Sequence, residues 1–422
     1  MDSQKTILIV AVVAIIAIAA GAAVFLMNNG SDDPDVPTGN TVVDVAGRTV
    51  EIPDNLDNGI VTVGKLSVVR MLSYFPESFN KIKMVDLNIQ SSLDNAGQNY
   101  AYIDSMKAVI AGAQTHETDT LSDADKEAIG ILNPSLIIVN KDAYSGNKDT
   151  CDLLAKSFTL IVVDPMSEFD YNPFWTSDYQ LKDDFKACFT LFGKILKQED
   201  RAKELINGMN SALKDLKGMM SGTAAGNYYV SGISYMGVND LLATFPNFLS
   251  LMMINGTNSY VDAKGPYDGI RVQLADGDAL TEFKFTDVII DPSSFPKLNP
   301  TNENSQIFLK YVYTKNQETG TDIKIHVIYP MVAFGTNWET AIINAMYLAN
   351  MCYGEKYTSD ELAKKSADLM DIFFKDNGKG VLKGIENSIK MKGQKAAGGQ
   401  DLSIFSDQTV ILKDGKYYLG TA

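Results

Sequence analysis

Ser234 lies in the stretch Gly232-Ile-Ser-Tyr-Met-Gly237, which comes close to the sharp strand-to-helix turn that presents a nucleophilic serine in hydrolases. Met236 stands where that turn needs its second glycine. A serine hydrolase also needs a well-placed histidine as its base, and the chain contains only His116 and His326. We keep a hydrolase that uses Ser234 as an alternative, and we expect no catalytic residue in this chain.

Metal chemistry also lacks its usual side chains. The two histidines are far apart, and Cys151, Cys188 and Cys352 contain no pair at C-x-x-C spacing. The sequence therefore predicts no zinc site and no direct capture of a bare soft metal ion. Three cysteines do not predict a disulfide framework, although a single disulfide between two of them is kept as an alternative. No glycine-rich phosphate loop occurs, so the usual signals of nucleotide and dinucleotide binding are absent.

Aromatic residues are abundant, with 19 tyrosines and 19 phenylalanines. Many tyrosines stand beside Gly, Asn or Asp, where loops are expected. Aromatic rings that line a cleft bind planar or partly apolar ligands, and their hydroxyl groups orient the ligand. The alternative for each is an ordinary half-buried surface tyrosine with a satisfied hydroxyl. The tyrosines in such places are Tyr100, Tyr102, Tyr171, Tyr235, Tyr260 and Tyr267.

The length and charge of the chain restrict its class. At 422 residues the chain is too long for one ordinary core, and an apolar content of 45% supports a globular interior. The formal net charge of −15 repels nucleic acid and other polyanions, so no nucleic-acid partner is expected. We therefore expect two lobes that bind something other than a polyanion.

The N-terminal segment predicts a membrane anchor. Residues Ile7 to Met27 form an uncharged apolar run of 21 residues, which is long enough to span a bilayer as a helix. A cleaved signal peptide is the alternative, because the run contains small residues at 20–23 that suit a cleavage site. We assign residues 1–28 to the anchor or signal and residues 29–40 to a polar tether. Lys5 precedes the run and acidic residues follow it, so the body is expected at the extracytoplasmic face of the cell membrane.

Short apolar strands alternate with helical segments on both sides of the middle of the chain. Residues 41–177 begin with a predicted hairpin at 41–53 and continue with strands at 60–63, 83–87, 136–139 and 160–163. Residues 221–379 repeat this rhythm, with strands at 228–230, 287–290 and 323–328 and helices at 240–254, 306–313, 338–353 and 360–374. The alternation predicts two α/β lobes of the Rossmann-like type.

Between the lobes, residues 178–220 contain no proline and repeat apolar residues at helical spacing. The preferred interpretation is a single long helix that joins the lobes as a rigid strut. The alternative is two consecutive helices with a break near Gln198-Glu199-Asp200. Residues 380–422 form a C-terminal tail, with a hairpin predicted across Asp414-Gly415.

Four local patterns add to this order of segments. They are D-x-x-G-R-x-V-x-x-P at 44–53, a helix-then-strand segment at 127–139 that begins with Glu127, a strand-to-loop passage at 229–237, and Gly335-Thr-Asn-Trp-Glu339. Together they resemble the substrate-binding proteins of ABC importers for iron-siderophore complexes and cobalamin, particularly their archaeal membrane-anchored branch. The similarity runs from about residue 42 to residue 380.

The resemblance implies a ligand cleft and two docking residues for a permease. Glu127 matches the family's docking glutamate in the first lobe, whereas the second lobe offers only Asp276 or Asp278. The family often has a histidine where Gly237-Val-Asn-Asp240 stands here, and the small Ala341 lies one turn beyond Asn337. Asn337 is the preferred ligand contact, and Trp338 is expected to pack beneath the loop. The full set of expected ligand contacts is Asn337, Tyr235, Trp338, Tyr100, Tyr102 and His116.

The sequence thus predicts an extracytoplasmic, membrane-tethered solute-binding protein without enzymatic activity or a cofactor of its own. Its ligand would be a small-molecule metal chelate, an iron(III) chelate or a corrinoid, and its partners an ABC permease and its ATPase subunits. The alternatives are the same scaffold with another cargo, such as an oxyanion, a haem or a different metal chelate, and a cell-surface adhesion or scaffold protein.

Overall fold

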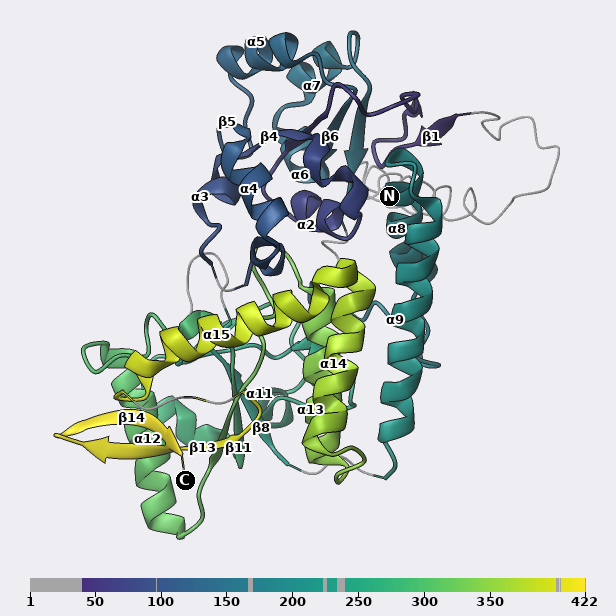
Figure 1. The fold of residues 1–422 in the computed structure, drawn as a ribbon. Helices are drawn as coiled ribbons and strands as arrows, with labels where there is room; N and C mark the ends of the chain where they lie inside the picture. The colour runs from purple at the N-terminus through teal and green to yellow at the C-terminus, as the bar shows by residue number, and fades with distance from the viewer. Residues whose placement is uncertain are drawn as a thin grey trace, which may run out of the picture. The chain divides into compact units, whose positions relative to one another are not determined.

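The computed structural model describes residues 40–95, 97–165, 170–222, 226–233, 240–399, 402 and 404–421. These residues form an α/β fold with parallel and mixed sheets (Figure 1). The chain divides into two compact units. Unit 1 comprises Met1–Ser91, Ala108–Ser167 and Leu181–Ile206, and unit 2 comprises Ser92–Lys107, Glu168–Gln180 and Asn207–Ala422. No helix in the described ranges is long and apolar enough to cross a membrane, and the predicted anchor lies outside them.

Unit 1 contains a five-stranded parallel sheet in the order β5-β4-β3-β6-β7. Four of its strands are short, mostly apolar runs that are largely buried on both faces, as parallel sheets require, whereas the edge strand β5 is the polar Gln-Thr-His. The predicted strands at 60–63, 83–87, 136–139 and 160–163 are confirmed within one residue. The five strands are β3 (Ile60–Val63), β4 (Ile82–Asp86), β5 (Gln114–His116), β6 (Leu136–Asn140) and β7 (Leu160–Val163).

Helices cover this sheet. On one face, Ile129 of α5 and Cys151 and Leu154 of α7 pack against Val61 and Val139 in a buried apolar cluster. The connecting elements are α2 (Val68–Ser73), η1 (Pro76–Lys81), α3 (Leu87–Ser91), α4 (Asp104–Gly112), α5 (Asp123–Leu132), α6 (Lys141–Gly146) and α7 (Lys148–Leu154).

The predicted N-terminal hairpin is present as β1 (Thr41–Val43) and β2 (Thr49–Glu51), which pair antiparallel. Asp44 explains the D-x-x-G-R pattern at this hairpin. Its buried carboxylate accepts hydrogen bonds from Arg48 Nε at 2.9 Å and from Arg48 Nη2 at 2.6 Å, and it also accepts from the backbone amide of Val162 at 3.1 Å. The salt bridge stabilises the hairpin turn, and the hydrogen bond from Val162 joins the hairpin to β7 within unit 1.

The prediction of one continuous helix at 178–220 is wrong, and the two-helix alternative is confirmed. The chain forms α8 (Asp183–Ile195) and α9 (Glu199–Met219). Lys197 adopts a left-handed conformation at φ 57°, which ends the first helix. Gly193 allows the helices to approach, because a Cβ there would lie 2.6 Å from Cβ of Ala202. The boundary between the units falls inside α9, after Ile206.

Unit 2 contains a seven-stranded mixed sheet in the order β10-β9-β8-β11-β12-β13-β14. The central strands β8, β11 and β12 are parallel, and the outer strands are antiparallel. The strands are β8 (Tyr228–Ser231), β9 (Ala243–Thr244), β10 (Val272–Gln273), β11 (Asp287–Ile290), β12 (Lys324–Val327), β13 (Asp407–Lys413) and β14 (Lys416–Thr421).

The helices predicted in unit 2 are confirmed in three places and wrong in one. The segment expected to be a helix, 240–254, contains only the two-residue strand β9 and the four-residue helix α10, because Pro246 interrupts the apolar run. The predicted C-terminal hairpin is confirmed, and a long helix precedes it. The helical elements of unit 2 are η2 (Asn99–Tyr102), α10 (Leu249–Met252), α11 (Ser259–Lys264), η4 (Asp278–Glu282), η5 (Pro292–Ser294), α12 (Glu303–Thr319), α13 (Trp338–Cys352), α14 (Ser359–Phe374), η6 (Lys375–Asn377) and α15 (Gly378–Ala396).

Candidate functional site

Ligands of open α/β sheets bind outside the carboxyl ends of the parallel strands, so each unit offers one such edge. In unit 1 this edge carries His116, at the end of β5. Both ring nitrogens face carbonyl oxygens, with Nε2 2.9 Å from the oxygen of Thr62 and Nδ1 2.7 Å from that of Glu117. The side chain is buried. These contacts join β5 to β3, and the predicted role of His116 as a ligand contact stays a prediction.

Asp86 and Asn140 occupy the rest of the edge in unit 1. The buried carboxylate of Asp86 accepts from the backbone amides of Asn88 at 2.8 Å and Asp119 at 3.0 Å. The side chain of Asn140 caps α6 and donates to the carbonyl of Leu66 at 3.3 Å. The loops that follow β3, β4 and β6 are therefore fixed by side chains of the unit itself.

In unit 2 the carboxyl edge is organised by Asp291, directly after β11. Its carboxylate is fully buried and accepts from the backbone amides of Ser293 at 2.8 Å and Met331 at 2.9 Å, and from the Ser293 hydroxyl. Burial raises the pKa of Asp291 to about 6, although these hydrogen bonds oppose the shift. Asp291 thus joins the loop after β11 to the loop after β12.

The loop after β12, at 328–337, is held by buried polar side chains of α13. Asn344 accepts from the amide of Tyr329 and donates to its carbonyl, both at 3.0 Å. The hydroxyl of Thr340 donates to the carbonyl of Pro330 at 2.8 Å. The side chains of Asn344 and Thr340 thus pair with backbone groups of the loop that would otherwise be buried without hydrogen bonds. This explains why polar residues lie on a buried face of α13.

Asn337 stands at the N-terminus of α13, and its side chain is fully buried. Its Nδ2 donates to the carbonyls of Gly97 at 2.9 Å and Pro330 at 3.1 Å, and it makes no side-chain capping bond to the helix. Its Oδ1 finds no hydrogen-bond partner in the described ranges. The sequence predicts Asn337 as the preferred ligand contact. In this structure its amide nitrogen is already used in hydrogen bonds to Gly97 and Pro330.

A second contact reinforces this one. Asn99 Nδ2 donates to Oε1 of Glu339 at 2.7 Å, and both side chains are buried. The Oδ1 atom of Asn99 also has no partner among the residues described. Gly97 fits this place because a Cβ would lie 2.9 Å from Cβ of Ala333. Residues 97–99 and 337–339 therefore form a buried polar cluster in unit 2, with two acceptor oxygens left over.

Trp338 is buried, as the prediction of a packing residue requires. It is 1% exposed, and its ring meets Phe174 edge-on with centroids 5.2 Å apart. Phe174 contacts Trp175 in the same way at 5.1 Å. Both tryptophans of the chain thus belong to one aromatic cluster in unit 2. Whether Trp338 contacts a ligand stays a prediction.

Tyr100 and Tyr102 lie on η2 in unit 2. The Tyr100 hydroxyl donates to Oε1 of Gln98, and its side chain is buried. The ring of Tyr102 packs on α15 at Gly384, where a Cβ would lie 2.5 Å from Tyr102 Cδ1. Burial raises the pKa of Tyr102, so it stays a neutral hydroxyl at physiological pH. Tyr235 lies outside the described ranges.

The predicted docking residues are solvent-exposed. Glu127 lies on α5 in unit 1. Asp276 and Asp278 lie in unit 2, where Asp276 Oδ1 accepts from the backbone amides of Asp278 at 3.0 Å and Ala279 at 3.1 Å. Asp276 thus stabilises the start of η4, whereas no hydrogen bond from another described residue orients the carboxylate of Asp278, which is the more available of the two.

Sequence reasoning did not name Asp291 or Asn99 as site residues. A carboxylate directly after an apolar strand and before proline was a usable signal for Asp291, because such positions mark the ends of parallel strands. Asn99 had no signal, because its partner stands 240 residues away in sequence. Across the described ranges, no three His, Cys, Asp or Glu side chains are grouped closely enough to hold a metal ion.

We compared the chain with known proteins by sequence and by structure. No family model matches the sequence, and no curated protein matches it. Solved structures do match. A periplasmic solute-binding protein from Veillonella parvula superposes with a TM-score of 0.54 at 13% identity, covering 83% of this chain and 99% of its own. The molybdate periplasmic binding protein of Haemophilus influenzae, bound to molybdate, gives 0.56 at 14% identity, covering 80% and 98%.

A TroA-like periplasmic binding protein from Veillonella parvula gives a TM-score of 0.53 at 17% identity and covers 79% of this chain and 96% of its own. At these identities the likeness establishes the fold alone. The chain has the fold of periplasmic solute-binding proteins, and the superposition covers nearly the whole length of each of these three proteins.

Proposed function

We propose that this protein is the extracytoplasmic solute-binding component of an ABC importer, and that its cargo is an iron(III) chelate or a corrinoid. The observation that carries the proposal is the fold, because two α/β units match whole periplasmic solute-binding proteins at TM-scores above 0.5. Fold alone does not determine function, so the proposed role must be tested by measuring which cargo the protein binds.

The buried polar cluster of unit 2 supports a binding role. Unpartnered acceptor oxygens on Asn99 and Asn337 are costly in a folded protein unless a ligand or water satisfies them. They lie beside the N-terminus of α13, at the carboxyl edge of the sheet, where ligands of this type of fold bind. Asn337 is therefore proposed to contact the cargo after a small rearrangement of the loop at 328–337.

The proposed partner of the loaded protein is a permease with its ATPase subunits, and the membrane tether is the N-terminal segment. Glu127 and Asp278 are the proposed docking residues, because each is an exposed carboxylate that forms no ion pair with another described residue. Replacing Glu127 with Gln should reduce transport while cargo affinity stays unchanged.

Tryptophan fluorescence tests the proposal directly. Both tryptophans lie in one aromatic cluster of unit 2, so a cargo that absorbs light should quench both when it binds nearby. The titration uses the full chain with an iron(III) tris-catecholate, an iron(III) tris-hydroxamate, cyanocobalamin, haem and molybdate. Saturable quenching by one iron chelate or by the corrinoid supports the proposal. Saturable binding of molybdate alone, detected by calorimetry, would instead support the oxyanion alternative.

A further inference from the structure

α15 differs in the sign of its charge from the rest of the chain. It carries Lys379, Lys383, Lys390, Lys392 and Lys395 against the single acidic residue Glu386, a net charge of +4. Because the whole chain has a net charge of −15, all other residues together carry −19. Every other described helix of ten or more residues has at least as many acidic as basic residues.

Three of these lysines form one stripe. At about 100° per residue, Lys379, Lys383 and Lys390 fall within roughly 40° of one another around the helix axis, and all three are exposed. Glu386 lies on the same stripe, and its Oε1 accepts a hydrogen bond from the Tyr329 hydroxyl at 2.7 Å. Lys379 and Lys383 form no ion pair with any residue in the described ranges. We call Lys379, Lys383 and Lys390 the lysine stripe.

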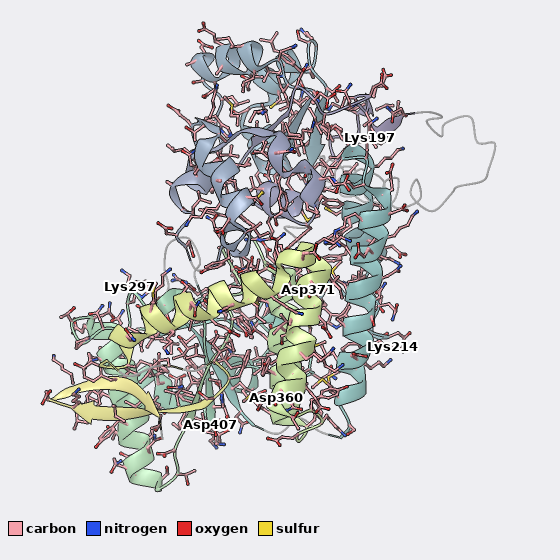
Figure 2. All side chains as sticks on the ribbon, viewed as in Figure 1. Lys197, Lys214, Lys297, Asp360, Asp371 and Asp407 are labelled. Carbon is pink, nitrogen blue, oxygen red and sulfur yellow. The ribbon has the colours of Figure 1, made fainter. Side chains whose placement is uncertain are left out.

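The opposite side of α15 packs against the rest of unit 2, and this packing fixes the direction in which the lysine stripe faces. Val381, Ile385 and Ile389 are buried, and Gly384 lies against the ring of Tyr102. α14 and α15 pack as neighbours (Figure 1). Figure 2 shows Asp360 and Asp371 near the two ends of α14, which is itself acidic. A positive stripe is therefore displayed on an otherwise negative molecule.

We propose that the lysine stripe recognises an anionic small-molecule cargo, so that the protein takes a negatively charged metal chelate in preference to a neutral one. This inference rests on the proposed solute-binding function. A small anion is repelled by the net charge of the chain at long range. Within the screening length of about 8 Å at physiological salt, it experiences the local charge over α15.

An anionic membrane is the other partner that lysines attract, and the charge balance argues against it. A membrane surface is extended, so it would meet the repulsion of the remaining −19 charge as well as the attraction of one helix. A small chelate bound at the stripe lies within one screening length of these lysines and experiences mainly their charge. The magnitudes therefore favour a small ligand.

The test compares wild type with K379E/K383E and with K310E/K356E, which changes the net charge equally at exposed lysines elsewhere in unit 2. The ligands are a trianionic iron(III) tris-catecholate and a neutral iron(III) tris-hydroxamate. Wild type should bind the anionic chelate more tightly, and K379E/K383E should weaken that binding about tenfold without changing the melting temperature. Affinity for the neutral chelate, and both affinities of K310E/K356E, should stay near wild type.

Each other outcome overturns the inference. If wild type binds both chelates equally, and K379E/K383E does too, the cargo is not selected by charge, although the solute-binding function stands. If wild type binds neither chelate, the proposed function fails and the stripe's role fails with it. The three proteins are also tested for binding to phosphatidylglycerol vesicles, and a loss of vesicle binding alone in K379E/K383E would show that the stripe binds membranes instead.

Discussion

Asp291 is the buried carboxylate at the carboxyl end of β11, and its environment makes the stability of unit 2 depend on pH. Burial raises its pKa from 3.8 to about 6. The folded state therefore binds more protons than the unfolded state between these values, and the stabilisation present below pH 4 is lost as pH rises through 6. The free energy of unfolding should fall by at most about 3 kcal/mol over this window from Asp291 alone.

Urea denaturation of wild type and Asp291→Asn at pH 4, 5, 6 and 7 measures this difference. The variant cannot titrate at this position, so the wild-type free energy relative to the variant should decline as pH rises. Asp322→Asn, at an exposed position, is the control and should follow wild type throughout. Parallel profiles for wild type and Asp291→Asn would show that the carboxyl group does not titrate in this range.

Asn337 makes a second prediction at the level of a single residue. Its Nδ2 donates to two carbonyl oxygens, and only a donor fits there. Asn337→Asp has nearly the same shape but turns a carboxylate toward Gly97 and Pro330, so it should destabilise the protein more than Asn337→Ala. The expected cost is about 1–3 kcal/mol for Ala and more for Asp.

Thermal unfolding monitored by circular dichroism gives the order of the two variants, and the fluorescence titration gives their cargo affinity. A variant with unchanged stability and lost affinity would assign Asn337 to the cargo alone. Equal stability of the Asp and Ala variants would mean that the two carbonyls do not constrain this side chain.

The junction between α8 and α9 shows which features an element's sequence can and cannot predict. The apolar period through residues 181–216 is continuous, because both helices turn a buried face toward neighbouring structure, so period alone could not reveal the break. The break depends on the backbone of Lys197 and on a side chain missing at Gly193. By contrast, the inner parallel strands of both sheets were predictable, because buried parallel strands are short apolar runs between turn residues. The strands β5, β9 and β10 have only two or three residues each and were not predicted.

Gly193→Ala tests the reason for this junction. The added Cβ would lie 2.6 Å from Cβ of Ala202 and 3.2 Å from the carbonyl oxygen of Gln198, so α8 and α9 would have to separate. The expected destabilisation is about 1–3 kcal/mol. Gly130→Ala on α5 is the matched control, because its Cβ meets nothing within 4 Å. The control should be stabilised by about 0.5–1 kcal/mol, and similar effects of both substitutions would contradict the packing argument.

The candidate site was predictable only where it depends on local sequence. Trp338 and Asn337 were found because they begin a helix after a strand, which is a local pattern. The contacts of Asn337 to Gly97 and of Glu339 to Asn99 join segments that the sequence separates by 240 residues, and no spacing rule brings them together. The net charge of residues 378–396 was visible in the sequence. The exposure of their lysines and the packing of α15 against the rest of unit 2 were not.

At the scale of the whole molecule, the C-terminal tail completes the mixed sheet. β13 pairs with β12 through Ile325 and His326, and Phe405 stacks on Tyr347 with ring centroids 3.8 Å apart. The amide of Phe405 also donates to the carbonyl of Val327 at 2.9 Å. Without this tail β12 becomes an unpaired edge strand, and an exposed apolar edge promotes association between chains.

A chain that ends at Gly399 should therefore melt at a lower temperature and associate at concentrations where the complete chain does not. Because we attribute association to the exposed edge of β12, Phe405→Ala should leave β12 paired and the protein monodisperse. It should still lower the melting temperature, since the half-buried stacking contact with Tyr347 is lost. Light scattering and thermal unfolding of the two variants separate these effects. Association of Phe405→Ala to the same degree as the truncated chain would show that loss of packing, rather than exposure of β12, is the cause.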